Sequence, residues 1–155
     1  MNAMRVQVAS DFVLLRAGLQ ALLAHNSNAQ VVSESDTSSA LVESARQAQP
    51  NILLLDISQD APETFEMISE LKNTIPTIKI IALTEMEDNS LAIRLLRAGV
   101  TGCLSRRESP TELAQAIETV ARGEVFLCSS ASNALLKEYR GQSRALSTAR
   151  VKKHL

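Results

Sequence analysis

The sequence has few aromatic residues, few cysteines and no long apolar run. Only 3% of its 155 residues are aromatic, whereas 45% are hydrophobic, so we expect an aliphatic core. Cys103 and Cys128 form neither a CxxC motif nor a Cys/His cluster, which argues against a zinc or redox site and favours buried thiols. A membrane span would need about 20 apolar residues in succession. No such run and no secretory leader is present, so we expect a cytoplasmic protein without membrane contact.

The charge is distributed unevenly along the chain. Residues 1–136 carry 10 basic and 16 acidic side chains, whereas residues 137–155 carry 6 basic and 1 acidic. An acidic body is a poor surface for nucleic acids. The basic tail has the composition of a linker, although contact with phosphates is an alternative for this segment.

Apolar strand patterns alternate with amphipathic helix patterns over most of the chain. The run 52–55 has no polar position before Asp56, which predicts a strand buried on both faces. Strands are predicted at 5–9, 31–32, 52–55, 78–83 and 102–104, and helices at 12–24, 39–47, from 60 onward, 89–98 and 109–122. Five strand–helix units in succession predict a parallel sheet with helices on both faces.

Local signals mark the ends of several helices. Asp60 stands before a proline and an acid and is predicted to cap the helix that follows. Ser109 and Glu112 form a capping box at the start of the last of the five helices. Gly99 and Gly123 are predicted to end helices in a left-handed conformation.

Four polar residues lie at or just beyond predicted strand ends, namely Asp11, Asp56, Thr84 and Arg106. Right-handed crossovers place the carboxyl ends of all strands on one edge of the sheet, so we expect these side chains to meet there. A pair of carboxylates suits Mg²⁺. Asp56 could then attack a phosphoryl group whose oxygens Thr84 and Arg106 bind. Taken singly, Asp11 could instead cap a helix, Thr84 be a strand-end hydroxyl and Arg106 a surface charge.

Seven stretches, in their order and spacing, carry a resemblance to a known family. They are Val6–Asp11, Leu15–Leu19, Ile52–Asp56, Ile80–Thr84, Leu96–Leu104, Ser109–Ile117 and Gly123–Leu127. Together they resemble the receiver domain of bacterial two-component response regulators, most of all the NarL/FixJ group of LuxR-type transcription factors. The resemblance implies a flavodoxin-like (βα)5 fold, a doubly wound five-stranded parallel sheet. It also implies an aspartyl-phosphate switch that uses Mg²⁺ and a partner histidine kinase.

The resemblance also implies roles for individual residues. Asp56 matches the phosphoacceptor, Asp11 matches a metal-binding acid, and Thr84 matches the switch hydroxyl. The main-chain carbonyl of Ser58 matches a further metal ligand beside Asp11 and Asp56. We expect no enzymatic turnover beyond slow autophosphorylation and autodephosphorylation at Asp56.

The chain departs from the family pattern at several positions, among them three in or near the predicted site, and also at Gln59, Asp60 and Thr64. Ser10 stands where a second acid is usual, Arg106 where a lysine is near-universal, and Cys103 where an aromatic switch residue is usual. The neutral Ser10 should lower metal affinity, and the planar fork of Arg106 is not equivalent to a compact ammonium. Cys103 has no ring to swing in and out of the core. We therefore expect a degenerate phosphorylation pocket.

These observations predict a receiver domain at 5–127, followed at 128–155 by a helix and a basic linker. The linker is expected to lead to a helix-turn-helix domain absent from this chain, through which alone DNA would be bound. The predicted function is the signal-input domain of a transcriptional response regulator that controls DNA binding through homodimerisation. The alternatives are a fully active Mg²⁺-dependent aspartyl-phosphate receiver and a flavodoxin-like small-molecule-binding module.

Overall fold

The computed structural model describes residues 3–26, 28–58, 61–85, 89–129 and 131–141. In chain order the elements are β1 (Met4–Ala9), α1 (Val13–Ala24), β2 (Ala29–Ser35), α2 (Ala40–Ala48), β3 (Ile52–Asp56), α3 (Pro62–Thr74), β4 (Lys79–Thr84), α4 (Asn89–Arg97), β5 (Gly102–Ser105), α5 (Pro110–Ala121) and β6 (Phe126–Leu127). A further helix includes residues 131–141. None of the helices in these ranges has the length and apolar character needed to cross a membrane.

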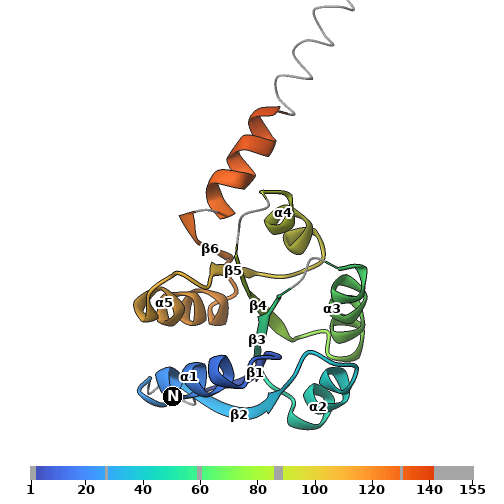
Figure 1. Cartoon of the computed structure of the whole chain (residues 1–155), viewed down its shortest axis with the longest axis vertical. Coiled ribbons are helices and arrows are strands. Elements are labelled where there is room, and N and C mark those ends of the chain that lie inside the picture. Colours follow the sequence, from blue (N-terminus) through green and yellow to red (C-terminus); the bar gives the residue numbers. More distant parts are fainter. Residues whose placement is uncertain (1–2, 27, 59–60, 86–88, 130, 142–155) are drawn as a thin grey trace, which may run out of the picture.

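All strands belong to one parallel sheet with the order β2-β1-β3-β4-β5-β6. The order changes direction between β1 and β3, which is the switch point of a doubly wound sheet. Helices α1 and α5 cover one face of the sheet, and α2, α3 and α4 cover the other (Figure 1). This arrangement confirms the predicted flavodoxin-like α/β fold.

The sheet has one strand more than the five that the sequence predicts. Strand β6 has two residues and pairs in parallel with β5. Backbone hydrogen bonds from Phe126 N to the Thr101 carbonyl (2.9 Å) and from Cys128 N to the Cys103 carbonyl (3.0 Å) attach it. Two residues are too few to show a strand periodicity, so the sequence pattern did not reveal this strand.

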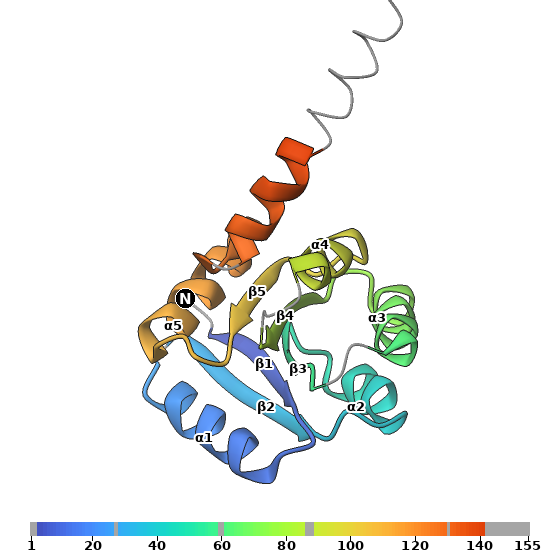
Figure 2. The ribbon, with the colours of Figure 1, turned by 45° about the horizontal axis from the view of Figure 1, so that its top comes forward.

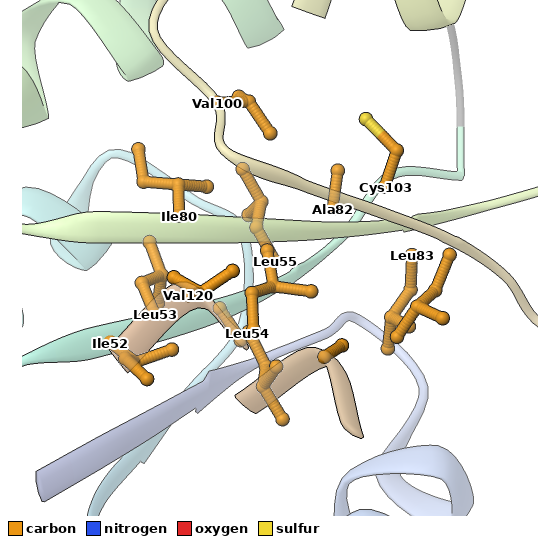
Figure 3. Packing of buried hydrophobic residues seen from close by; sticks show 14 of the residues in the cluster. Ile52, Leu53, Leu54, Leu55, Ile80, Ala82, Leu83, Val100, Cys103 and Val120 are labelled. Atoms are coloured by element: carbon orange, nitrogen blue, oxygen red, sulfur yellow. The ribbon is translucent and has the colours of Figure 1, made fainter. Parts of the chain in front are cut away.

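The core is built from aliphatic side chains, as the composition predicts. All five residues of β3 are buried, because helices pack on both faces of this central strand. Figure 3 shows Ile52, Leu53, Leu54 and Leu55 of β3 beside Ile80 and Ala82 of β4, and all of these residues belong to one core cluster with Val120 of α5. Within the described ranges, the buried hydrophobic residues include no aromatic side chain.

The structure confirms the predicted cap at Ser109 and the predicted left-handed conformations at Gly99 and Gly123. The Ser109 hydroxyl accepts a 3.3 Å hydrogen bond from the backbone N–H three residues later and caps α5. Gly99 and Gly123 have φ values of 103° and 86°, the left-handed region in which glycine is favoured. The cap of α3 is Ala61, which makes no side-chain capping bond. The predicted cap, Asp60, lies outside the described residues.

The chain beyond β6 first packs against the core and then leaves it. Ala131 and Ala134 are buried, whereas Leu136 and Tyr139 are exposed. The helix that includes residues 131–141 extends away from the sheet in both views (Figures 1 and 2). The predicted basic linker at 142–155 lies outside the described residues.

Candidate functional site

The strand register brings the predicted site together at the carboxyl edge of the sheet. Ala9 of β1 pairs with Leu55 of β3, so the next residue of each strand, Ser10 and Asp56, lie side by side. Thr84 of β4 pairs with the residue before Arg106, so Arg106 emerges on the other side of Asp56. Ser10, Asp56 and Arg106 are far apart in the sequence. Parallel pairing of the strands brings them together.

The Asp56 carboxylate is buried, and both of its oxygens accept hydrogen bonds. The residue is 3% exposed. Its Oδ2 accepts a hydrogen bond of 2.7 Å from the Ser10 hydroxyl. Its Oδ1 lies 2.7 Å from Nε and 2.6 Å from Nη2 of Arg106. The buried negative charge is therefore neutralised by a side chain of the same domain.

Arg106 spans the site from its base to its rim. Its Nη2 also donates to the Ile57 carbonyl oxygen at 2.7 Å. Its Nη1 lies 3.3 Å from Oε1 of Glu85, an exposed residue just beyond β4. The guanidinium thus makes contacts that a compact lysine ammonium could not make at one time, because its donors are spread over a planar fork. The alternative in which Arg106 is only a surface charge is not observed.

Asp11 forms its hydrogen bonds with the loop after β2. Its Oδ1 accepts hydrogen bonds from the backbone N–H of Thr37 at 2.8 Å and from the Thr37 hydroxyl at 2.7 Å. It does not cap α1 either, because the cap residue is Phe12 and makes no side-chain capping bond. The sequence predicted that Asp11 lies at the carboxyl edge of the sheet. No sequence pattern predicted its hydrogen bonds with Thr37.

A cleft of about 290 Å³ lies next to Asp56. Its lining includes Asp11, Asp56 and the exposed Ser58, three residues that the sequence analysis assigned to metal binding. Glu63, at the start of α3, adds a further acid to the lining. The cleft is thus polar and acidic, and it opens between the loop after β2 and α3.

Thr84 and Cys103 are both buried within the sheet. Thr84 closes β4, and its carbonyl oxygen accepts a 3.0 Å hydrogen bond from the backbone N–H of Arg106. Cys103 is buried in β5, as predicted. Burial, together with the neighbouring Cys128, raises the pKa of the Cys103 thiol to about 12. The thiol is therefore protonated at neutral pH and acts as a small apolar side chain.

The side chains at this edge fit a guanidinium better than Mg²⁺. A magnesium ion needs oxygen ligands in near-octahedral geometry and favours carboxylates. Here Arg106 holds the Asp56 Oδ1, Ser10 contributes a neutral hydroxyl that donates to Oδ2, and Asp11 is held by Thr37. Within the described ranges, no three His, Cys, Asp or Glu side chains form a group that could hold a metal. In this arrangement the Asp11 and Asp56 carboxylates are bound by side chains of the same domain.

The geometry limits what Asp56 can do chemically. A carboxylate that accepts hydrogen bonds from a hydroxyl and a guanidinium has its negative charge stabilised in the ground state, which opposes nucleophilic attack. Three contacts that produce this state were not predicted: the Ser10 hydroxyl, the Ile57 carbonyl and Glu85. The residue order at the strand ends could have indicated the first, because Ser10 and Asp56 occupy matching positions on neighbouring strands.

Comparison with known proteins matches most of this chain to one family. The model of the response regulator receiver domain matches residues 6–118. Response regulator GacA from Pseudomonas viridiflava is 30% identical over 139 residues, which cover 89% of this chain and 65% of GacA. The chain therefore spans about 65% of the length of this relative.

Solved structures with the same fold include two response regulators. RcsB from Salmonella typhimurium, in a structure that concerns its conformational dynamism for DNA interaction, is 26% identical with a TM-score of 0.80. The match covers 91% of this chain and 69% of that chain. A two-component response regulator of the LuxR family from Aurantimonas sp. SI85-9A1 has a TM-score of 0.81 at 21% identity, over 89% of this chain and 99% of that chain. The similarity to the Aurantimonas protein shows that the two chains share a fold.

Proposed function

Because this chain belongs to the response regulator receiver domain family, we propose that it is the signal-input domain of a transcription factor with a degenerate phosphorylation pocket. In this proposal, Asp56 is not phosphorylated efficiently, and the domain controls DNA binding through homodimerisation. DNA contact is assigned to a helix-turn-helix domain outside this chain. A histidine kinase is the partner that the family implies, and a degenerate pocket would weaken its control.

The carrying observation is the pair of contacts between Arg106 and the Oδ1 atom of Asp56, at 2.7 and 2.6 Å. A phosphoryl donor and its metal would have to displace this guanidinium from a buried carboxylate. The displacement is costly, because breaking a buried ion pair leaves a charge without its partner. Ser10 adds to the barrier, since it supplies a hydroxyl donor to Asp56 and no negative charge for a metal.

The regulatory part of the proposal rests on relatives. RcsB has been captured as dimers bound to DNA. The structure of Salmonella typhimurium RcsB that is 26% identical to this chain also concerns DNA interaction. We transfer dimer-controlled DNA binding from these regulators to the protein that contains this chain. The acidic charge of residues 1–136 supports a DNA contact outside this part of the chain.

One observation favours the second candidate, a fully active receiver. The cleft beside Asp56 is lined by Asp11, Asp56 and Ser58, the positions that the family resemblance assigns to the metal. If Arg106 turned outward toward Glu85, which it already contacts at 3.3 Å, Asp56 would face this cleft without its cation. The two candidates therefore differ in whether Arg106 leaves Asp56 when a phosphoryl group arrives.

Binding of beryllofluoride, a phosphoryl mimic, distinguishes the two candidates. We expect no saturable binding when the chain is titrated with Mg²⁺ and beryllofluoride in a calorimeter. The variant with both Ser10→Asp and Arg106→Lys should bind, because it gains a carboxylate and replaces the fork by an ammonium. Adding Asp56→Asn to that variant is the control and should abolish binding. Saturable binding to the unmodified chain that Asp56→Asn removes would establish the active receiver instead.

A further inference from the structure

A small apolar cavity lies between α1 and the start of α5, which are neighbours on one face of the sheet (Figures 1 and 2). We call it the leucine pocket, because six leucines line it: Leu15, Leu19, Leu22, Leu83, Leu104 and Leu113. Leu104 of β5 is buried, whereas Leu22 is 43% exposed, so the pocket leads from the sheet to the surface. Its volume is about 140 Å³. This is room for about five groups of the size of a water molecule, which suits a small ligand.

Four polar residues also line the leucine pocket, and three of them have partners within the domain. The Ser105 hydroxyl accepts a hydrogen bond from a backbone N–H at 3.2 Å. The Ser109 hydroxyl caps α5, and Arg106 is bound to Asp56. These three side chains are therefore already satisfied by the fold.

Glu108 is the fourth polar residue, and it differs from the others. Its side chain is partly buried at the pocket, and it makes no hydrogen bond or ion pair with any residue that the structure describes. The nearby Arg106 does not offset its charge, because two acids, Asp56 and Glu85, already hold that guanidinium. A partly buried carboxylate beside an apolar wall is stabilised by a cation that enters the same cavity.

We propose that the leucine pocket binds a small amphipathic cation, a primary alkylamine, whose chain packs between the leucines and whose ammonium group pairs with Glu108. Residues 1–136 carry a net charge of −6, which attracts cations to this domain and repels anions of the same size. A neutral chain would fill the pocket but leave Glu108 without a partner. The site lies outside the phosphorylation pocket, so the inference goes beyond the proposed function.

Arg106 connects the leucine pocket with Asp56. Asp56 lines the acidic cleft described above, whereas Arg106 lines the leucine pocket, so the two members of the ion pair face different cavities. A bound ammonium group would repel the guanidinium and favour its position on Asp56. The amine would thus be a second input, one that strengthens the ion pair. This regulatory step, unlike the binding itself, rests on the proposed function.

Titration of the ¹⁵N-labelled 155-residue chain with pentylammonium chloride tests the site. Backbone amide signals in NMR spectra report both the affinity and the place of binding. We expect saturable shifts centred on Leu22, Glu108 and Leu113. The dissociation constant should be on the order of 1 mM, because a ligand of this size makes few contacts. If no signal shifts saturably, or if the shifts centre on Asp11 and Glu63 in the acidic cleft, the assignment of the pocket is wrong.

Two matched ligands separate the charge from the chain. Pentanol has the same chain without the charge and should bind about tenfold more weakly than pentylammonium, because it makes no charge-assisted hydrogen bond to Glu108. Pentanoate reverses the charge and should not bind. Equal affinities for pentylammonium and pentanol, or binding of pentanoate, would contradict the proposal.

Glu108→Gln tests the role of the carboxylate. It should raise the dissociation constant of pentylammonium about tenfold and leave that of pentanol unchanged, because only the ion pair is lost. Glu118→Gln is the matched control, since it removes the same charge from an exposed position of α5 outside the pocket lining, and it should change neither value. An equal effect of both variants would mean that the domain attracts amines through its net charge alone.

Hydrogen exchange at the Nε of Arg106, which donates to Asp56 at 2.7 Å, tests the coupling. Saturating pentylammonium should slow this exchange, and the effect should be absent in Glu108→Gln. Unchanged or faster exchange in the saturated chain would refute the coupling. The titrations contain neither metal nor phosphoryl mimic, so their results are independent of whether Asp56 binds beryllofluoride.

Discussion

The ion pair between Arg106 and the buried Asp56 is expected to contribute to stability. In Arg106→Met, the buried Asp56 carboxylate loses its cation while an apolar chain of similar length remains. Breaking a buried pair in this way should lower the free energy of unfolding by about 3 kcal/mol. Urea unfolding followed by circular dichroism measures the change.

The matched control for this prediction also removes the charge of Asp56. Arg106→Met combined with Asp56→Asn should recover most of the lost stability, because no unpaired charge is left in the core. If Arg106→Met alone unfolds at the same urea concentration as the unmodified chain, the ion pair contributes nothing to the fold in solution.

The positions of the site residues could be predicted from the sequence, but their partners could not. The order of the parallel strands places Asp56, Thr84 and Arg106 at the carboxyl edge of the sheet, independently of the contacts that their side chains make. The contact of Asp11 with Thr37 depends on the path of the loop after β2, which carries no pattern. The same holds for Gln7, a buried polar residue of β1 whose amide donates to Ser35 at 3.2 Å.

At the scale of elements, the cap of α5 offers a clean test. The Ser109 hydroxyl accepts a hydrogen bond from the N–H of Glu112, which would otherwise lack a partner at the start of the helix. Ser109→Ala should therefore lower the free energy of unfolding by about 1 kcal/mol. Thermal unfolding by calorimetry gives the comparison, and Ser109→Asp, which keeps a capping oxygen, should stay close to the unmodified chain.

The predicted elements were most accurate where the pattern was strongest. The prediction of 52–55 for β3 was correct to within one residue, because a strand buried on both faces has an unbroken apolar run. The additional residue, Asp56, is polar and pairs with Leu83 of β4. Strand β2 was predicted only at 31–32 but includes Ala29–Ser35. It is an edge strand with polar residues, so most of its length has no apolar alternation. Long-range pairing with β1, which the sequence does not encode locally, extends it.

For the whole molecule, the segment after β6 should contribute to the stability of the receiver. Cys128, Ala131 and Ala134 are buried against the core, although they follow the last strand. A chain that ends at Leu127 should therefore be less stable than one that ends at Gly141 by about 2 kcal/mol, from the apolar surface that is uncovered. Urea unfolding of the two chains makes the comparison, and equal midpoints would show that this helix is not part of the folded unit.

The two-residue strand β6 has a consequence for aggregation. A parallel sheet presents unpaired backbone groups along both outer strands, and another chain can add to them by strand pairing. Beyond β5 this template is only two residues long, and the chain then enters a helix in which Ala131 and Ala134 are buried. Strand addition on that side would have to displace the helix. Fibril-like growth of this domain would therefore begin at β2, where seven residues form the outer strand.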